Sequence, residues 1–221
     1  MPLIELRDET AGYNGTAVLR GISLRIEAGE RVALVGESGA GKSTLLRLLY
    51  DRCGPSAALM PQDLGLVQAL TVFHNVYMGR LHLRSVWRNL RNLLLPAAAD
   101  VAEVREVLAA LRLEDKVFSP VGELSGGQHQ RTALGRALYH PGNVIVADEP
   151  VSAVDEHQAR ELLGTMNAKK RTVILAMHDR GLAIAFADRL IGLKEGKIVL
   201  DTPSAGMTPA DLDELYRVAP E

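Results

Sequence analysis

The sequence has little of what marks secreted, membrane-spanning or nucleic-acid-binding proteins. A single cysteine, Cys53, excludes an internal disulfide framework and is typical of a reducing compartment. The richest apolar runs, at 32–35, 144–147 and 172–177, are far shorter than the roughly 20 residues of a membrane helix. A formal net charge of −2 disfavours nucleic-acid binding through overall basic charge. We expect no signal peptide and a chain that serves a membrane only through partners.

What is present is an alternation of apolar strands and helical patterns. Hydrophobic residues make up 47% of 221 residues, enough for a sizeable core. The patterns predict strands at 31–35, 143–147 and 172–176, and helices at 42–50, 102–111, 126–138 and 156–166. This order indicates the α/β class, with a largely parallel sheet covered by helices. Segments 3–6 and 19–26 predict an antiparallel pair, and Glu195-Gly196 marks a C-terminal hairpin.

Residues from about 63 to 120 show helices and turns without a clear strand. We interpret 63–135 as a helical lobe inserted into an α/β core of residues 1–62 and 136–221, all within one domain. A basic run in this lobe surrounds Trp87 and consists of Arg80, His82, Arg84, Arg88 and Arg91. It is either a solvated helix face or a contact with a partner or with lipid head groups.

A glycine-rich loop follows the strand at 31–35 and opens a helix. Residues 36–43 match the pattern G-x-x-x-x-G-K-[ST] in full. In such a loop backbone N–H groups surround phosphates, Lys42 supplies charge to the β and γ phosphates, and Ser43 places a hydroxyl on Mg²⁺. The predicted ATP contacts are therefore Gly36, Glu37, Ser38, Gly39, Ala40, Gly41, Lys42, Ser43 and Thr44.

Two carboxylates, Asp148 and Glu149, end the apolar strand at 143–147. Asp148 can hold the shell of Mg²⁺, and Glu149 can orient and polarise the attacking water. An acidic strand end is a weak signal by itself, and it becomes a strong one together with a phosphate loop.

A second candidate phosphate site begins at Ser125. Its hydroxyl can cap the helix that follows, and Gly126 and Gly127 let the backbone approach an anion closely. Because the phosphate loop already holds one nucleotide, this second site suggests a second chain. With Leu124 and Gln128 completing the pentapeptide, the sequence resembles the ATP-binding cassette (ABC) ATPases over nearly its whole length.

The resemblance implies roles for further residues. Tyr13 lies where the family stacks an aromatic ring on adenine, with a surface tyrosine in a turn as the alternative. Gln62 is similar to the Q-loop glutamine, which senses Mg²⁺ and links the core to the helical lobe. Asp155 ends a D-loop in which Val154 replaces the usual leucine. His178 is similar to the switch histidine that contacts the γ-phosphate.

These comparisons with the family complete a predicted site for ATP and Mg²⁺. The implied catalytic residues are Lys42, Glu149 and His178. The implied metal ligands are Ser43, Gln62 and Asp148. Nucleotide contacts beyond the phosphate loop are Tyr13, Gln62, Ser125, Gly126, Gly127, Gln128 and Asp155.

One interval departs from the family pattern. Only 20 positions separate Lys42 from Gln62. Most family members have a longer interval here, which holds a β-hairpin. We therefore expect a P-loop ABC cassette with a parallel core, a trimmed antiparallel lobe and an inserted helical lobe.

The resemblance also implies partners. Two chains should meet head to tail as a homodimer, each ATP lying between the phosphate loop of one chain and residues 125–128 of the other. Transmembrane permease subunits, and through them a solute-binding protein, are the expected partners, and no nucleic acid is expected. The implied location is peripheral, at the cytoplasmic face of the cell membrane.

Within the family, the importer ATPases for phosphonate and phosphite are the most similar, at residues 70–80, 85–88, 144–150 and 213–217. Importers of other small polar solutes, such as amino acids, remain an alternative. A non-transport accessory of phosphonate metabolism is another. Soluble ABC ATPases of DNA repair, chromosome or ribosome work usually carry coiled-coil arms, zinc sites or a second cassette, and the sequence shows none of these.

Overall fold

The computed structural model describes residues 2–13 and 15–216, and within them six strands form a central sheet in the order β4-β5-β6-β3-β7-β8. The strands are β3 (Arg31–Val35), β4 (Ala57–Met60), β5 (Val144–Asp148), β6 (Thr172–Ala176), β7 (Arg189–Lys194) and β8 (Lys197–Pro203). All pairs are parallel except β7 with β8. The predicted α/β class and largely parallel sheet are confirmed.

A second, antiparallel sheet pairs β1 (Ile4–Tyr13) with β2 (Thr16–Ile26) in the described part of the chain. Arg20 N–H donates to Gly196 O at 2.9 Å, which ties β2 to the turn between β7 and β8. A Cβ on Gly196 would lie 1.9 Å from Val18 O, so this close approach requires glycine.

The interval from Lys42 to Gln62 holds only one helix, one short turn and one strand. Helix α1 (Lys42–Cys53) is followed at once by a 3₁₀ turn, η1 (Gly54–Ser56), and by β4. No hairpin interrupts residues 42–62, all of which the structure describes. The antiparallel lobe is therefore as small as the sequence predicts.

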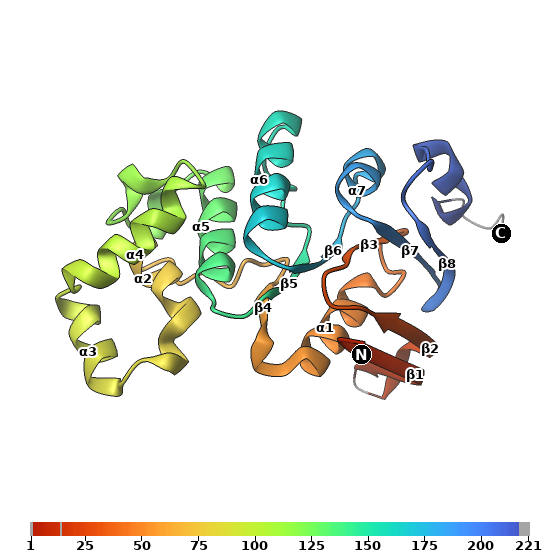
Figure 1. Cartoon of the computed structure of the whole chain (residues 1–221), viewed down its shortest axis with the longest axis horizontal. Helices are drawn as coiled ribbons and strands as arrows, with labels where there is room; N and C mark the ends of the chain where they lie inside the picture. The colour runs from red at the N-terminus through yellow and green to blue at the C-terminus, as the bar shows by residue number, and fades with distance from the viewer. Residues whose placement is uncertain (1, 14, 217–221) are drawn as a thin grey trace.

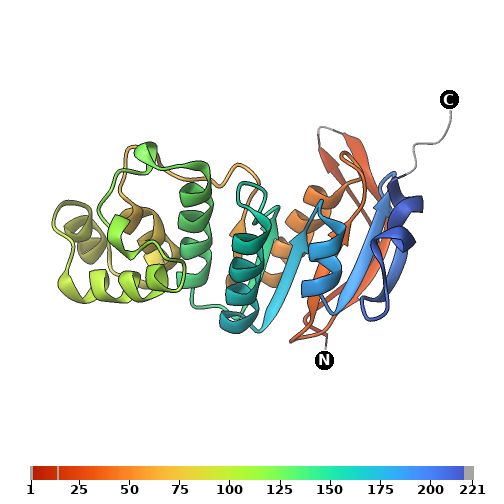
Figure 2. The same ribbon diagram turned by 90° about the horizontal axis from the view of Figure 1, so that it is seen from above.

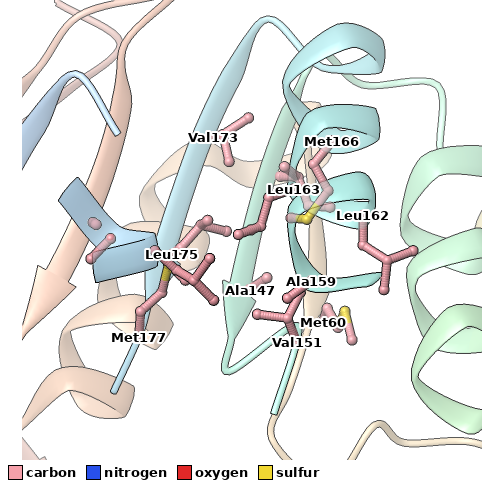
Figure 3. Close-up of a cluster of buried hydrophobic side chains, with 14 of the residues drawn as sticks. Met60, Ala147, Val151, Ala159, Leu162, Leu163, Met166, Val173, Leu175 and Met177 are labelled. Carbon is pink, nitrogen blue, oxygen red and sulfur yellow. The ribbon is translucent and has the colours of Figure 1, made fainter. Parts of the chain in front are cut away.

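The core sheet buries both faces, and β3 shows how. Val32 and Leu34 pack in a cluster with α1 and the small sheet, whereas Ala33 and Val35 pack in a cluster on the opposite face. The helices of that opposite face are α5 (Gly126–Tyr139), α6 (Glu156–Lys169) and α7 (Arg180–Phe186). Figures 1 and 2 show these layers, and Figure 3 shows side chains of α6 lying among those of β5 and β6.

A helical lobe extends from one edge of the sheet (Figure 1). It comprises α2 (Val72–Tyr77), η2 (Met78–Leu83), α3 (Val86–Leu94), α4 (Ala98–Ala109), η3 (Glu114–Lys116), η4 (Val121–Glu123) and α5. A separate apolar cluster, which includes Phe73, Leu108 and Tyr139, holds it together. The expected boundary between residues 135 and 136 falls inside α5, which runs on without interruption.

The last described element is the 3₁₀ segment η5 (Pro209–Tyr216), which packs beside β7 and α7. Among residues 2–13 and 15–216, no helix is both long enough and apolar enough to cross a bilayer.

Candidate active site

Four functional loops meet at the carboxyl ends of four neighbouring strands. In the order of the sheet, Gln62 follows β4, Asp148 ends β5 and Glu149 follows it, His178 follows β6, and the phosphate loop follows β3. Because these strands are parallel, their carboxyl ends lie on one edge, where open α/β sheets bind ligands. The fold therefore brings together the predicted catalytic and metal-binding groups.

The phosphate loop takes a backbone shape that only glycine allows. Gly36 and Gly41 have φ values of 142° and 103°, and a Cβ on Gly36 would lie 2.3 Å from Leu193 O. Gly41 is the N-cap of α1, and no side-chain hydrogen bond caps this helix in the described chain. The first N–H groups of α1 are therefore free of a side-chain cap, as an anion site at a helix start requires.

Lys42 folds back over this loop. Its ammonium Nζ donates to Gly36 O and to Glu37 O, both at 2.8 Å. Burial lowers the pKa of Lys42 from its ordinary value, while the negative charges of Glu149 and Asp148 oppose that shift. A phosphate in the loop would offer this buried cation a charged acceptor in place of two carbonyls.

Asp148 and Ser43 provide oxygen atoms beside the loop. Burial raises the pKa of Asp148, and nearby Glu149 adds to this, whereas a hydrogen bond with Ser43 and the charges of Lys42 and His178 act in the opposite direction. Ser43, Asp148, Gln62 and Tyr13 line one cleft of about 500 Å³. Carboxylate, hydroxyl and amide oxygens fit Mg²⁺, which prefers oxygen ligands and usually shares them with phosphate.

Glu149 is held from two sides. Its Oε1 lies 2.7 Å from Nε2 of His178, and Nε2 of Gln62 donates to the same oxygen at 3.5 Å. The backbone of Glu149 has a φ of 51°, a conformation that non-glycine residues seldom adopt and that is concentrated at functional sites. This geometry aims the carboxylate into the space between the loops after β4 and β6.

Gln130 is a residue that the sequence reasoning missed. It is buried in α5, where its Nε2 donates to Glu149 O at 2.9 Å and to Ser152 Oγ at 3.3 Å, and its Oε1 accepts from Ala153 N at 3.0 Å. The amide thus joins the helix that begins at Ser125 to the backbone around Glu149. Its position two residues after Gln128 carries no local signal of this role, because all three partners come from another part of the chain.

The second predicted phosphate site has the expected local structure. Ser125 and Gln128 form a capping box at the start of α5, with hydrogen bonds of 3.0 and 3.4 Å, and the predicted cap is confirmed. Ser125 and Gly126 are exposed. A Cβ on Gly127 would lie 3.2 Å from Val154, so the segment before α6 packs against this helix start.

This helix start is not beside the phosphate loop of its own chain. Helix α5 contacts β4, whereas the phosphate loop follows β3, three strands further across the sheet. At roughly 4.8 Å per strand, β4 and β3 lie about 14 Å apart. Asp155 likewise serves its own chain as the N-cap of α6, accepting from Gln158 N at 2.9 Å. In one chain, the hydrogen bonds of Ser125 and Asp155 lie at the starts of their own helices and not in the cluster around Lys42.

The chain matches a known protein family. The family described as "ABC transporter" matches residues 19–152, more than half of the chain. The chain belongs to the ABC transporter family. The cassette is an ATPase, and the predicted fold and activity are confirmed, while the roles of individual residues remain predictions.

Similar proteins extend the comparison. The cassette is 39% identical over 232 residues to the phosphonates import ATP-binding protein PhnC of Pseudomonas fluorescens (strain Pf0-1), covering 92% of this chain and 87% of the relative. It is 36% identical over 242 residues to PhnC of Anaeromyxobacter dehalogenans (strain 2CP-C), covering 97% of this chain but only 48% of that relative. This chain thus spans about half the length of the second relative.

A solved structure shares the fold. A dimeric, post-hydrolysis state of the ATP-binding cassette MJ0796 with ADP and Pi matches with a TM-score of 0.78. The match covers 92% of this chain and 99% of that chain at 24% identity, so it supports the architecture alone.

Proposed function

We propose that this cassette is the ATP-hydrolysing motor of an importer for phosphonates or phosphite. The observation that carries the proposal is the similarity to two proteins named as phosphonates import ATP-binding proteins, at 39% and 36% identity over most of this chain. In this role the cassette lies at the cytoplasmic face of the membrane beneath permease subunits, which receive the solute from a binding protein. Of the branch-specific segment 213–217, Arg217 lies outside the described residues.

The motor works as a head-to-tail dimer. The start of α5 is exposed, and its helix packs against β4, three strand spacings from β3, which carries the phosphate loop of the same chain, so we assign this helix start to the nucleotide of another chain. A two-fold arrangement makes both composite sites equal, with each ATP between one phosphate loop and the partner's Ser125. Closure around ATP buries the site, and hydrolysis reopens it.

Within each site, the residues of this chain have distinct tasks. Lys42 and the N–H groups of the loop bind the phosphates, and Ser43, Asp148 and Gln62 would hold Mg²⁺. The bound metal ion would neutralise charge on the phosphate oxygens. Glu149 orients the attacking water and accepts its proton at the carboxylate, and His178, whose Nε2 lies 2.7 Å from that carboxylate, would sense the γ-phosphate.

The permease contact is supported by the unusual orientation of α3. This helix is attached to its lobe by polar groups: Arg88 Nη2 donates to Asp100 Oδ1 at 2.6 Å, Asn92 Nδ2 donates to Asp100 Oδ2 at 2.7 Å, and Tyr77 OH donates to Asn89 Oδ1 at 3.0 Å. Asp100 is buried beneath the helix. The polar side of α3 therefore faces the protein.

Its apolar side faces outward. Trp87 and Leu94 are each 81% exposed and Val86 is 78% exposed. The outward face of α3 consists of Val86, Trp87, Leu90, Leu93 and Leu94. An apolar patch of this kind on a soluble lobe marks an interaction site.

The basic run around Trp87 is largely engaged in ion pairs within the lobe and is not needed to explain this interaction site. Arg80 and Arg84 pair with Glu103, and Arg88 pairs with Asp100, so three of its five members already have acidic partners within the lobe. This pairing favours a protein surface over lipid head groups as the partner of the outward face. We assign that surface to the permease.

Growth on defined phosphorus sources tests the solute. A strain that lacks this cassette should fail to grow when a phosphonate or phosphite is its sole phosphorus source, and it should grow on inorganic phosphate. A plasmid with the wild-type gene should restore growth, and one with Glu149→Gln should not. Normal growth of the deletion strain on all reduced phosphorus compounds, with no second importer present, contradicts the solute assignment. Co-purification with a soluble enzyme complex instead of a permease would favour the accessory role.

A further inference from the structure

The C-terminal segment η5 lies against the core beside the phosphate loop. Leu212 and Leu215 are buried in the cluster that also holds α7. A Cβ on Gly192 of β7 would lie 2.8 Å from Cδ1 of Leu215, so the absence of a side chain at this position makes room for the segment. The segment is therefore packed in place, which fixes the residue at its end, Tyr216.

The hydroxyl of Tyr216 reaches the first residue of the phosphate loop. Gly36 N–H donates to Tyr216 OH at 3.1 Å. The carbonyl of the same glycine accepts from Lys42 Nζ at 2.8 Å. Gly36 cannot carry a side chain, because its Cβ would collide with Leu193 O. The position of Gly36 therefore depends on β3 before it and on the two side chains, Tyr216 and Lys42, that bond to its backbone.

Arg180 holds the tyrosine from the other side. Its guanidinium lies over the Tyr216 ring at 4.2 Å from the centroid, donates to Pro209 O at 3.2 Å and pairs with Asp213. Arg180 follows His178 by two residues and begins α7. The segment thus contacts the start of α7, two residues after His178, and Gly36 of the phosphate loop.

We propose that Tyr216 is a positioning residue for the phosphate loop, and that Arg180 holds it in place. Both residues lie outside the region 19–152 that matches the family, and no nucleotide motif contains either of them. The hydroxyl fixes the Gly36 peptide, and through it the N–H groups and the ammonium that meet the phosphates of ATP. The proposal rests on the phosphate-loop assignment and is independent of the transported solute.

The test removes one oxygen atom. Tyr216→Phe keeps the ring under Arg180 and deletes the acceptor for Gly36 N–H. Loss of one neutral hydrogen bond should raise KM for ATP about threefold to tenfold. The turnover number kcat should change less than twofold, because the loop contacts the phosphates in both the ground state and the transition state. The melting temperature should fall by no more than about 5 °C, as expected for one lost hydrogen bond in a chain of this size.

A matched control is Tyr77→Phe, which also deletes a bonded tyrosine hydroxyl but does so in the helical lobe. This control should leave KM for ATP unchanged. Arg180→Lys keeps the charge but loses the planar stack and the fork of donors, so it should raise KM in the same direction. When combined with Tyr216→Phe it should add little, because Arg180 acts through the hydroxyl that is already absent.

The outcomes separate the proposals. If KM in Tyr216→Phe stays within twofold of the wild type, Tyr216 does not position the loop. An equal rise in Tyr77→Phe also overturns the proposal, since it would reflect general loosening. A wild-type chain that does not bind ATP would contradict the proposed function of the whole site instead.

Discussion

Nε2 of His178 lies 2.7 Å from Oε1 of Glu149, and this contact joins the loops that follow β6 and β5. Gln62, after β4, donates to the same carboxylate oxygen at 3.5 Å. The carboxylate that should activate water is thus held by both neighbouring loops. If a bound nucleotide draws His178 or Gln62 toward itself, as the proposed roles require, the surroundings of Glu149 change with it.

Glu149→Gln should abolish hydrolysis while ATP binding persists. The amide has nearly the same shape, but it cannot accept the proton of water, and loss of a general base costs about 10²–10⁴-fold in rate. ATP should then hold two chains together, which size-exclusion chromatography with Mg-ATP detects. Turnover near that of the wild type would remove Glu149 from the role of base, whatever the oligomeric state.

Mixing two inactive variants tests the shared site. Lys42→Ala removes the positive charge that should bind the phosphates. Ser125→Arg places a bulky cation at the start of α5, where it blocks the partner's nucleotide and opposes the helix dipole. In a heterodimer both defects fall on one composite site and leave the other intact. With random pairing in a two-fold dimer, about a quarter of the wild-type ATPase activity should return. If no mixing ratio restores activity, the two sites are not shared between chains or do not act independently.

Gln130→Leu should destabilise the cassette and slow hydrolysis. Leucine fills a similar volume but leaves Glu149 O and Ala153 N without their buried partner. Such unsatisfied groups cost about 1–3 kcal/mol each. The melting temperature should fall by several degrees, and kcat should fall because the Glu149 backbone is less firmly held. Thermal unfolding followed by ATPase assays well below the transition measures both, and an unchanged kcat would limit Gln130 to a role in stability.

Burial makes the stability contribution of Lys170 depend on pH. Its Nζ donates to His140 O and Gly142 O, and burial, with a smaller effect of Arg80, lowers the pKa of Lys170 to about 8. The unfolded chain, with a pKa near the ordinary value, binds more protons than the folded chain between about pH 8 and 10.5. The cost of burying the charge is therefore fully present below pH 8 and disappears as the pH rises through this window. The wild type should gain stability relative to Lys170→Met from pH 7.5 to 9.5 in denaturant titrations; a flat difference would contradict this.

The sequence predicts the phosphate loop and the acidic strand end well because their shape is local. Gly36, Gly41 and Lys42 act within a few residues of one another, and a strand whose first four residues are apolar places Asp148 at its end without outside help. Gln130 and Tyr216 could not be predicted in the same way. Each acts on a partner that only the folded sheet brings near, Glu149 in one case and Gly36 in the other.

Helix α3 shows a second limit. An amphipathic helix of a globular protein usually turns its apolar side toward the core. The structure does the opposite because the buried carboxylate of Asp100 binds Arg88 and Asn92 and draws the polar side toward the lobe. Sequence alone did not reveal this, since Asp100 belongs to the next helix.

Trp87→Gln should leave the isolated cassette intact but weaken its association with the permease. The side chain is 81% exposed, so its loss should change stability by less than about 0.5 kcal/mol and should not affect ATP hydrolysis by the purified chain. Buried tryptophans at interfaces often carry more than 2 kcal/mol of binding free energy, which corresponds to about a thirtyfold loss of affinity.

The matched control is Val199→Gln, which replaces an exposed apolar residue of β8, in the ATP-binding core. Co-purification from membranes should fall for the Trp87 variant and persist for the Val199 variant. Equal recovery of both would show that the outward face of α3 does not contact the permease.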